Sequence, residues 1–416
     1  MATVLEQFAR TRAAASTLAM ASGESRNAVL RSIASFISQN SAEILRENQK
    51  DLDRMATDHP MRDRLKLTQE RLHDLTESVL SVTHLPDPTG QVLSHRILSN
   101  GLTLSKKTVP LGVVGVIFES RPNVTIDVAA LCIRSGNAVA LRGGSDAIHT
   151  NTILVELIHQ ALIQNGISTD VVYLMPTDRE LVTILLTAVK YIDVIIPRGS
   201  EALIQRVRKE SLVPTIETGA GVCHTYVAAK AEVEMSVAIV VNAKVSRPSV
   251  CNSLDTIVVH QSKAPEFLAK LVDPFTSFHV KIYADETSHA ILASLSYPFL
   301  EKAKLADFGR EFLDFACSIK VVDDFSEALA HIATYSSRHS EAIITSDESE
   351  ANYFLSAVDA AAVYWNASTR FTDGEEMGFG AEIGISNQKL HARGPMGLEA
   401  MTTTTWIVSG NGQIRS

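Results

Sequence analysis

The sequence predicts an α/β protein built from two parallel-sheet domains. Its 416 residues give room for two or three domains. Short β-prone runs alternate with helical periodicity over residues 110–218, and a second alternating series covers residues 254–366. Such alternation is typical of βαβ units around a mostly parallel sheet, with ligands at the carboxyl ends of the strands.

Composition narrows the class of protein. The chain is 45% hydrophobic and 20% charged, which is ordinary for a soluble enzyme, and its net charge of -9 argues against a nucleic-acid-binding role. No run approaches the roughly 18 apolar residues of a membrane span. The four cysteines lack metal-site spacing and suit a reducing compartment. We therefore expect a cytoplasmic protein with no metal, nucleic-acid or membrane partner.

Residues 1 to about 80 are periodic and helical in character. Arg10 and Arg12, among alanines and serines, also resemble a transit peptide. Phe8 and Leu18 instead suit one face of an amphipathic helix that continues into the next helical segment. The continuity favours the helix.

The two alternating series predict individual elements. In the first series we expect strands at 112–118, 138–141, 171–174, 193–196 and 214–217, and helices at 125–134, 147–164 and 179–190. In the second we expect strands at 254–259, 280–283, 317–322, 342–345 and 362–366, and helices at 264–272, 326–334 and 348–357.

A β-hairpin is predicted outside both series. Asn100-Gly101 between two short apolar runs is the strongest short-range hairpin signal. A hairpin of this length needs further strands for stability. The Thr-rich, β-prone residues 402–409 offer one, by pairing with this hairpin or with an edge of another subunit.

Cys251 is the most informative single residue of the sequence for chemistry. It follows a cationic, proline-containing turn and precedes the expected strand 254–259, where a nucleophile can be held. A lone cysteine is more often a small core residue. Glu217 closes the first series and Cys251 opens the second, so both would face a cleft between domains, the default place for a site.

Two turns of the first series have open interpretations. No GxGxxG fingerprint follows a strand, but Gly143-Gly144-Ser145 joins a strand to a helix, whose first N–H groups suit an anion. Such a turn is more often only a turn. Asn123 suits either a helix cap or a donor to an oxyanion, and composition favours the cap.

Several segments together resemble one family. They are PLGVVGVIFESRPNVTIDVAALCIRSGNAVALRGG from residue 110, IIPRGS at 195–200, VPTIETGAGVCH at 213–224, RPSVCN at 247–252, and NASTRFTDGEEMGFGAEIGISNQKLHARGPMGLEAMTT at 366–403. In order and spacing they resemble the gamma-glutamyl phosphate reductases, or glutamate-5-semialdehyde dehydrogenases, of the aldehyde dehydrogenase superfamily. The last segment is highly specific to that family.

The resemblance implies a fold and an assembly. It implies two Rossmann-like domains of the aldehyde dehydrogenase type: a cofactor-binding domain at 1–90 and 110–222, and a catalytic domain at 223–400. Residues 91–109 and 401–416 would form a β oligomerisation element, which implies a homo-oligomer. Association with glutamate 5-kinase is a further expectation, since glutamyl phosphate is unstable.

The implied activity is the NADPH-dependent reduction of L-glutamyl 5-phosphate to L-glutamate 5-semialdehyde in proline biosynthesis. Cys251 matches the superfamily's nucleophile. Asn123 matches the asparagine that forms the oxyanion hole with the cysteine's backbone N–H. Glu217 matches the general base of hydrolytic members, and we expect a structural or proton-shuttling role here, since a phosphorylating enzyme excludes water.

Binding residues are implied as well. The cofactor-binding positions are Arg142, Gly143, Gly144, Ser145, Pro197, Arg198, Gly199 and Glu311. Arg121, Arg247, Arg370 and Arg393 are candidates for the anionic substrate, because arginine forks suit carboxylate and phosphate. Arg247 is also a candidate cation for lowering the thiol pKa, with a backbone dipole and the bound cofactor as alternatives.

The chain departs from the family at two positions. Ser145 stands where the family usually has lysine, which leaves the preference between NADP and NAD open, and Thr405 precedes Trp406 where lysine is common. The main alternative function is an aldehyde dehydrogenase that hydrolyses its thioester. A binding or structural protein on a retired dehydrogenase scaffold is the alternative from another class.

Overall fold

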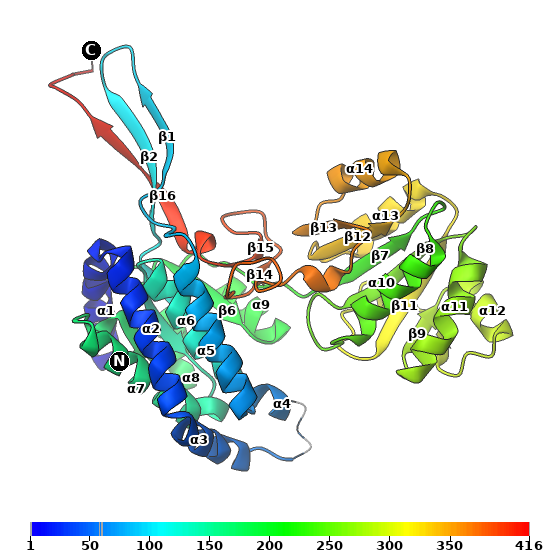
Figure 1. The fold of residues 1–416 in the computed structure, drawn as a ribbon, viewed down its shortest axis with the longest axis horizontal. Helices are drawn as coiled ribbons and strands as arrows, with labels where there is room; N and C mark the ends of the chain where they lie inside the picture. Colours follow the sequence, from blue (N-terminus) through cyan, green and yellow to red (C-terminus); the bar gives the residue numbers. More distant parts are fainter. Residues whose placement is uncertain (1, 58, 60, 416) are drawn as a thin grey trace. The chain divides into compact units, whose positions relative to one another are not determined.

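The chain folds into two α/β units, each around its own parallel sheet (Figure 1). The computed structural model describes residues 2–57, 59 and 61–415. Unit 1 comprises 1–218, 378–384 and 395–416, and unit 2 comprises 219–377 and 385–394. The predicted fold class, two parallel-sheet α/β domains with a small β element, is confirmed.

Unit 1 begins with the predicted helical region. Its helices are α1 (Ala2–Met20), α2 (Gly23–Gln39), α3 (Ser41–Asp53), α4 (Arg62–Leu65) and α5 (Gln69–His84). Phe8 and Leu18 are buried, so α1 is the predicted amphipathic helix. Ser22 caps α2 by accepting a hydrogen bond from the Ser25 N–H.

The sheet of unit 1 has the order β5-β4-β3-β6, and all its pairs are parallel. Its strands are β3 (Val113–Phe118), β4 (Ala138–Arg142), β5 (Val172–Leu174) and β6 (Val194–Arg198). The connecting helices are α6 (Asn123–Arg134), α7 (Ile148–Gln164), α8 (Arg179–Leu186) and α9 (Glu201–Glu210), with short 3-10 turns at Ser145–Ala147 and Thr169–Val171. β3 is buried along its whole length, as expected for a covered parallel sheet.

Two predictions in this unit are wrong. Residues 214–217 form no strand, because ladder pairing with β6 is limited to a single bridge between Ile195 and Thr215. Helix α8 ends at Leu186, four residues before the predicted end. The next residues include Thr187 and Val189, whose β-branched side chains disfavour helix.

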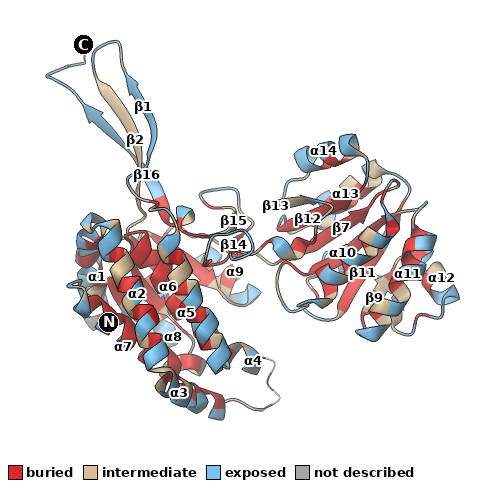
Figure 2. Cartoon of the chain, viewed as in Figure 1, coloured by how far each residue is buried: buried red, intermediate tan, exposed pale blue. Residues whose placement is uncertain are grey.

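Unit 2 contains a seven-stranded parallel sheet of order β10-β9-β11-β8-β7-β12-β13. The strands are β7 (Cys223–Val227), β8 (Leu254–His260), β9 (Lys281–Ala284), β10 (Leu300–Lys302), β11 (Ala316–Val322), β12 (Ser340–Ile344) and β13 (Ala362–Trp365). The helices are α10 (Val233–Val245), α11 (Ala264–Ser277), α12 (Glu286–Ser294), α13 (Phe325–Tyr335) and α14 (Glu348–Ala357), with 3-10 turns at Leu305–Asp307 and Thr369–Phe371. The central strands are buried (Figure 2).

Five elements have no counterpart among those predicted from the sequence: β7, α9, α10, α12 and β10. Helix α10 shows why: its Ile239-Val240-Val241 run is β-branched and resembles a strand. Packing against α11 and β8 selects the helix instead.

The third sheet is antiparallel and joins distant parts of the chain. β1 (Val92–Ile97) and β2 (Thr103–Pro110) form the predicted hairpin, and β16 (Thr402–Ser409) pairs with β2. Both predictions, the hairpin and its pairing with the C-terminal strand, are confirmed. This arm extends from unit 1 in Figure 1 and exposes Trp406, among other apolar residues. The chain also forms the short pair β14 (Ile385–Ser386) and β15 (Gly394–Pro395), and a 3-10 turn at Glu399–Met401.

Among the described helices, none has the length and apolar character needed to cross a bilayer.

Candidate active site

Cys251 lies in the turn between α10 and β8, as predicted from its place before a strand. It is partly exposed, whereas the other three cysteines are buried, and none of the four forms a disulfide. Its carbonyl oxygen accepts a hydrogen bond from the Cys223 thiol at 3.2 Å, and a Cβ added to Gly221 would overlap the same oxygen. The backbone of Cys251 is therefore fixed against segment 221–223, and its intermediate burial argues against the role of a small core residue.

Arg370 is brought to this turn by Asn252. The Asn252 amide donates to the Thr372 carbonyl at 2.9 Å, its side-chain oxygen accepts from the Arg370 guanidinium, and its carbonyl accepts from Thr369 Oγ1 at 2.7 Å. Burial lowers the pKa of Arg370, and the neighbouring charge of Arg247 lowers it further. Two arginines thus lie near each other beside the Cys251 turn.

The charges closest to the Cys251 turn belong to arginines. Cys251 opposes the lowering of the Arg370 pKa that burial causes, so the two side chains are close enough to interact. Helix α10 ends at Val245 and presents its negative end toward the turn, so its dipole does not favour a thiolate. Sequence reasoning named Arg247 for this role, but Arg247 is exposed and Arg370 is the half-buried cation.

Glu311 lies in the same neighbourhood of unit 2. Its carboxylate accepts a hydrogen bond from the Gly221 N–H at 2.9 Å, and Gly221 in turn packs on the Cys251 carbonyl. The structure thus brings together Cys251, Arg247, Arg370 and Glu311 within one unit.

Arg393 belongs to a different cluster of unit 2. Its guanidinium pairs with Asp359 at 2.8 Å, and Lys389 pairs with the same carboxylate at 2.9 Å. This pairing lowers the pKa of Asp359, through hydrogen bonds from Lys389 and Arg393. The recorded contacts of Arg393 therefore point to a structural ion-pair network.

The candidates of unit 1 gather at the carboxyl ends of its parallel strands. Arg121 and Asn123 follow β3, the 142–145 turn follows β4, and residues 197–199 close β6. Because β4, β3 and β6 are neighbours in one parallel sheet, these three segments share one edge.

Asn123 does not cap α6, so that interpretation is wrong. It is the first residue of the helix, Pro122 occupies the cap position, and no side-chain cap bond forms. A residue already inside the helix cannot reach back to the N–H groups that a cap serves. Its amide instead donates to Asp127 at 3.0 Å, one turn along, and remains exposed.

The start of α7, which follows the Gly143-Gly144-Ser145 turn, already receives a carboxylate of the chain. The first N–H groups of this helix are taken by the carboxylate of Asp51, which accepts from His149 at 3.1 Å and from Thr150 at 2.8 Å. Asp51 comes from α3 and is buried. A contact across about a hundred residues leaves no local signal in the sequence.

Arg142 is a partly buried arginine that leads into the same turn. Its guanidinium donates to the Thr177 carbonyl at 2.7 Å and to the Gly143 carbonyl at 3.3 Å. Burial is the main cause that lowers the pKa of Arg142. The positive charges of Arg206 and Arg179 lower this pKa further. Arg142, Arg179 and Arg206 therefore lie near one another at the carboxyl end of β4, together with the carboxylates of Glu119 and Asp146.

The turn after β6 already holds a carboxylate. Glu119 accepts from the Ser200 N–H at 2.9 Å, and a Cβ at Gly199 would overlap that carboxylate. Nearby, the Arg198 side chain lies against Gly384, where a Cβ would meet it at 2.7 Å. Glycine at 199 and 384 thus permits this close packing.

Glu217 is held by Arg208 in a bidentate ion pair. Arg208 Nε lies 3.0 and 2.9 Å from the two carboxylate oxygens, and its Nη2 donates as well. The pair raises the pKa of Arg208 through this hydrogen bond. Both carboxylate oxygens of Glu217 therefore accept from a permanent cation.

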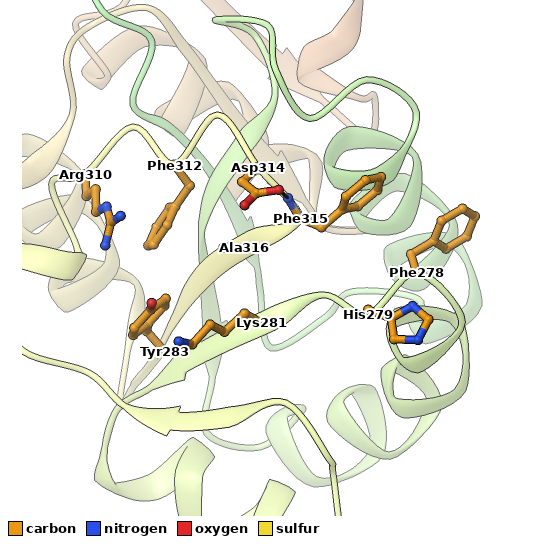
Figure 3. A pocket seen from close by; sticks show the side chains of 9 residues that line it. All are labelled: Phe278, His279, Lys281, Tyr283, Arg310, Phe312, Asp314, Phe315 and Ala316. Atoms are coloured by element: carbon orange, nitrogen blue, oxygen red, sulfur yellow. Dashed lines mark hydrogen bonds between the residues drawn. The ribbon is translucent and has the colours of Figure 1, made fainter. Parts of the chain in front are cut away.

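A pocket of about 480 Å³ opens on unit 2 (Figure 3). It is lined by Phe278, His279, Lys281, Tyr283, Arg310, Phe312, Asp314, Phe315 and Ala316. Two stacked ring pairs, Tyr283 with Phe312 and Phe278 with Phe315, form its walls. None of the predicted site residues lines it, although Glu311 lies in the same loop as Arg310 and Phe312.

Comparison with known proteins decides the family. The family model for the aldehyde dehydrogenase family matches residues 2–291. The gamma-glutamyl phosphate reductase of Chlorobium phaeobacteroides is 50% identical over 416 residues, covering 100% of this chain and 99% of the relative. That of Bacteroides fragilis is 48% identical, covering 99% of each chain.

The chain belongs to the gamma-glutamyl phosphate reductase family. The crystal structure of the gamma-glutamyl phosphate reductase from Thermotoga maritima agrees, with a TM-score of 0.94 at 38% identity, covering 99% of each chain. The protein is therefore an oxidoreductase of the aldehyde dehydrogenase family, and the resemblance found in the sequence is confirmed.

Proposed function

We propose that this protein reduces L-glutamyl 5-phosphate to L-glutamate 5-semialdehyde with NADPH and releases phosphate, as a cytoplasmic step of proline biosynthesis. One observation carries the proposal: Cys251 is a partly exposed thiol on a fixed backbone, with the half-buried cation Arg370 beside it. The relatives named gamma-glutamyl phosphate reductase support this substrate class.

In the first step the Cys251 thiolate attacks the acyl carbon of the acyl phosphate. The bond from Sγ to carbon forms, the bond from carbon to the phosphate oxygen breaks, and the electron pair leaves with phosphate. Phosphate is a good leaving group, so no general acid is needed. Arg370 and Arg247 suit this step because guanidinium groups pair with phosphate and favour the thiolate.

The second step converts the thioester to the aldehyde. NADPH, when bound, supplies the hydride that reduces the thioester carbonyl. The Asn123 amide and the Cys251 backbone N–H donate hydrogen bonds to the oxyanion of each tetrahedral intermediate, and one such donor is typically worth about 10²–10³ in rate. Collapse of the thiohemiacetal breaks the carbon–sulfur bond and returns Cys251 as a thiolate.

The residues of unit 1 fit a phosphorylated dinucleotide through arginine. Asp51 accepts from the N–H groups at the start of α7, and Glu119 accepts from the Ser200 N–H just before α9. We therefore assign the anion-binding capacity to Arg142 and its neighbours Arg179 and Arg206, beside the carboxylates of Glu119 and Asp146. We assign cofactor contacts to Arg142, Gly143, Gly144, Ser145, Pro197, Arg198, Gly199 and Glu311. The arginines favour NADP over NAD despite Ser145.

The contacts of Glu217 support a structural role. A general base needs a free carboxylate oxygen within reach of water, and Arg208 engages both oxygens of Glu217. This arrangement suits an enzyme in which phosphate, not water, exchanges with the thioester.

The substrate's α-carboxylate needs a separate cation. Arg121 is our first candidate because it lies on the β3–α6 loop with Asn123. Arg393 is second, because its guanidinium is paired with Asp359.

The partners follow from the same chemistry. We propose that the arm formed by β1, β2 and β16 joins subunits into a homo-oligomer, since it exposes Val92, Ile97, Trp406, Ile407 and Val408. Glutamate 5-kinase is the proposed donor of the unstable acyl phosphate, and co-sedimentation of the two proteins tests this.

The proposal is tested with Cys251→Ser, assayed for NADPH oxidation with glutamyl phosphate made in situ. Cys132→Ala is the matched control, because Cys132 is a buried thiol whose pKa is raised by burial. We expect activity to disappear in Cys251→Ser and to persist in the control. Turnover by Cys251→Ser at a rate close to that of the parent would overturn the proposal.

A further inference from the structure

The Lys244 side chain is fully buried in unit 2. It lies on α10, is 0% exposed, and its ammonium donates to the carbonyl oxygens of Asp314 at 3.1 Å and Ala316 at 2.8 Å. Its third polar neighbour is Asp255 on β8, at 3.9 Å. The ammonium therefore ties the loop before β11 to the helix that precedes the Cys251 turn.

Asp255 extends the same network in two directions. Its Oδ1 accepts from the Phe312 N–H at 3.0 Å, and its Oδ2 accepts from the Cys223 N–H at 3.5 Å. Burial raises the pKa of Asp255 to about 7, and the positive charge of Lys244 opposes that rise. The carboxylate thus holds the start of β7 and the loop that carries Glu311.

Both anchored segments carry groups of the candidate site. The start of β7 fixes Cys251 through the Cys223 thiol and through the close packing of Gly221. The loop holds Glu311, whose carboxylate accepts from the same Gly221. On the other side of this loop Phe312 stacks on Tyr283 at 5.4 Å, as Figure 3 shows, so the loop is held from two sides.

Stability does not explain why a charged pair is placed here. Replacing a buried ion pair with apolar groups of similar volume is often neutral or stabilising, because burial removes both charges from water. Loss of one partner alone is strongly destabilising, because it leaves an uncompensated charge. The Lys244–Asp255 pair therefore adds little to the free energy of unfolding. Because it contacts two segments that carry residues of the candidate site, its role is to position those segments.

We propose that Lys244 and Asp255 are positioning residues that hold the Cys251 turn and the Glu311 loop in the geometry required for cofactor binding and reduction. This inference rests on the proposed function through the roles of Cys251 and Glu311. Neither residue touches substrate in this proposal, and both act through the backbone of segments 221–223 and 310–316.

The test uses the double variant Lys244→Met/Asp255→Asn in the full chain. Methionine replaces the lysine stem without its charge, and the asparagine carbonyl keeps an acceptor for the Phe312 N–H. Phe267→Leu is the matched control, since Phe267 is a fully buried residue of α11 in the core of the same unit and its side chain makes none of the hydrogen bonds described for Lys244 and Asp255. Thermal melts first establish that both variants fold cooperatively.

Three readouts follow: the Kd for NADPH by fluorescence titration, kcat for reduction, and the rate of Cys251 alkylation by iodoacetamide. We expect the double variant to show at least a tenfold higher Kd and a tenfold lower kcat, with alkylation within about threefold of the parent. The Phe267→Leu control should lower the melting temperature and leave Kd and kcat within twofold. A folded double variant with parental Kd and kcat overturns the inference.

The outcomes separate this inference from the proposed function. NADPH binding is measured without substrate, so the Kd comparison stands even if the parent does not reduce glutamyl phosphate. If the double variant does not fold, Asp255→Asn alone is measured at pH 8, above the pKa of about 7, where the parent's Asp255 is ionised, with the same expectations and the same overturning result.

Discussion

Glu217→Gln distinguishes a structural glutamate from a general base. In the structure Glu217 is 12% exposed, Arg208 is 57% exposed, and Arg208 Nε lies 3.0 and 2.9 Å from the two carboxylate oxygens. Exposed ion pairs contribute about 0.2–1 kcal/mol to folding stability, and the bidentate geometry places this pair at about 1 kcal/mol. Urea unfolding should therefore show a small loss of stability.

The expected effect on activity is smaller than that of a lost base. General-base catalysis contributes about 10²–10⁴ in rate, so loss of a base would be obvious. Our account predicts that kcat for NADPH-dependent reduction stays within about threefold of the parent, because the first step expels phosphate without a base. The assay follows NADPH absorbance with glutamyl phosphate made in situ.

Arg208→Gln is the matched control, because it breaks the same ion pair from the other side. Both single variants should lose similar stability, and the double variant should lose no more than either, as expected for one shared interaction. A hundredfold loss of kcat in Glu217→Gln alone, with Arg208→Gln fully active, would refute the structural role of Glu217.

Three further predictions follow from other residues. Asn123→Ala should lower kcat about 10²–10³-fold with little change in KM, as steady-state kinetics would show, and an unchanged kcat would remove Asn123 from the oxyanion hole. Arg370→Gln should raise KM for the acyl phosphate about tenfold or more and slow Cys251 alkylation at pH 7, since a charge-assisted contact is worth about 1.5–3 kcal/mol; equal alkylation rates would exclude its effect on the thiol. Burial lowers the pKa of His331 to about 3, so its neutral form stabilises the fold above pH 6.5, and that stability declines as the pH falls from 6.5 toward 3. Urea midpoints of His331→Phe should depend less on pH across that window, and an unchanged pH dependence would contradict this.

Local patterns were sufficient to predict most of the fold. The expected helix at 348–357 coincides with α14, and the Asn100-Gly101 hairpin and the β-prone C-terminus meet in one sheet. These elements follow from turn chemistry and periodicity, which are short-range properties. Helix α10 was missed because its β-branched run has strand character that only tertiary packing overrides.

The candidate site was less accessible to sequence reasoning. Cys251 and the strand after it could be located from adjacent residues, but the approach of Arg370 depends on a hydrogen bond that its guanidinium donates to Asn252 across 118 residues. The α7 start seemed open to an anion because the residue that occupies it, Asp51, lies about a hundred residues earlier. Long-range polar contacts of this kind leave no periodicity and no motif in the sequence, so only the three-dimensional structure reveals them.

Phosphate dependence of semialdehyde oxidation tests the central claim most directly. The reverse reaction is run with NADP and then NAD, with and without phosphate or arsenate. Our account predicts that oxidation requires the anion and that NADP is preferred, because the Cys251 thioester is resolved by phosphate. Equal oxidation without phosphate or arsenate would contradict the account and indicate an aldehyde dehydrogenase that hydrolyses its thioester.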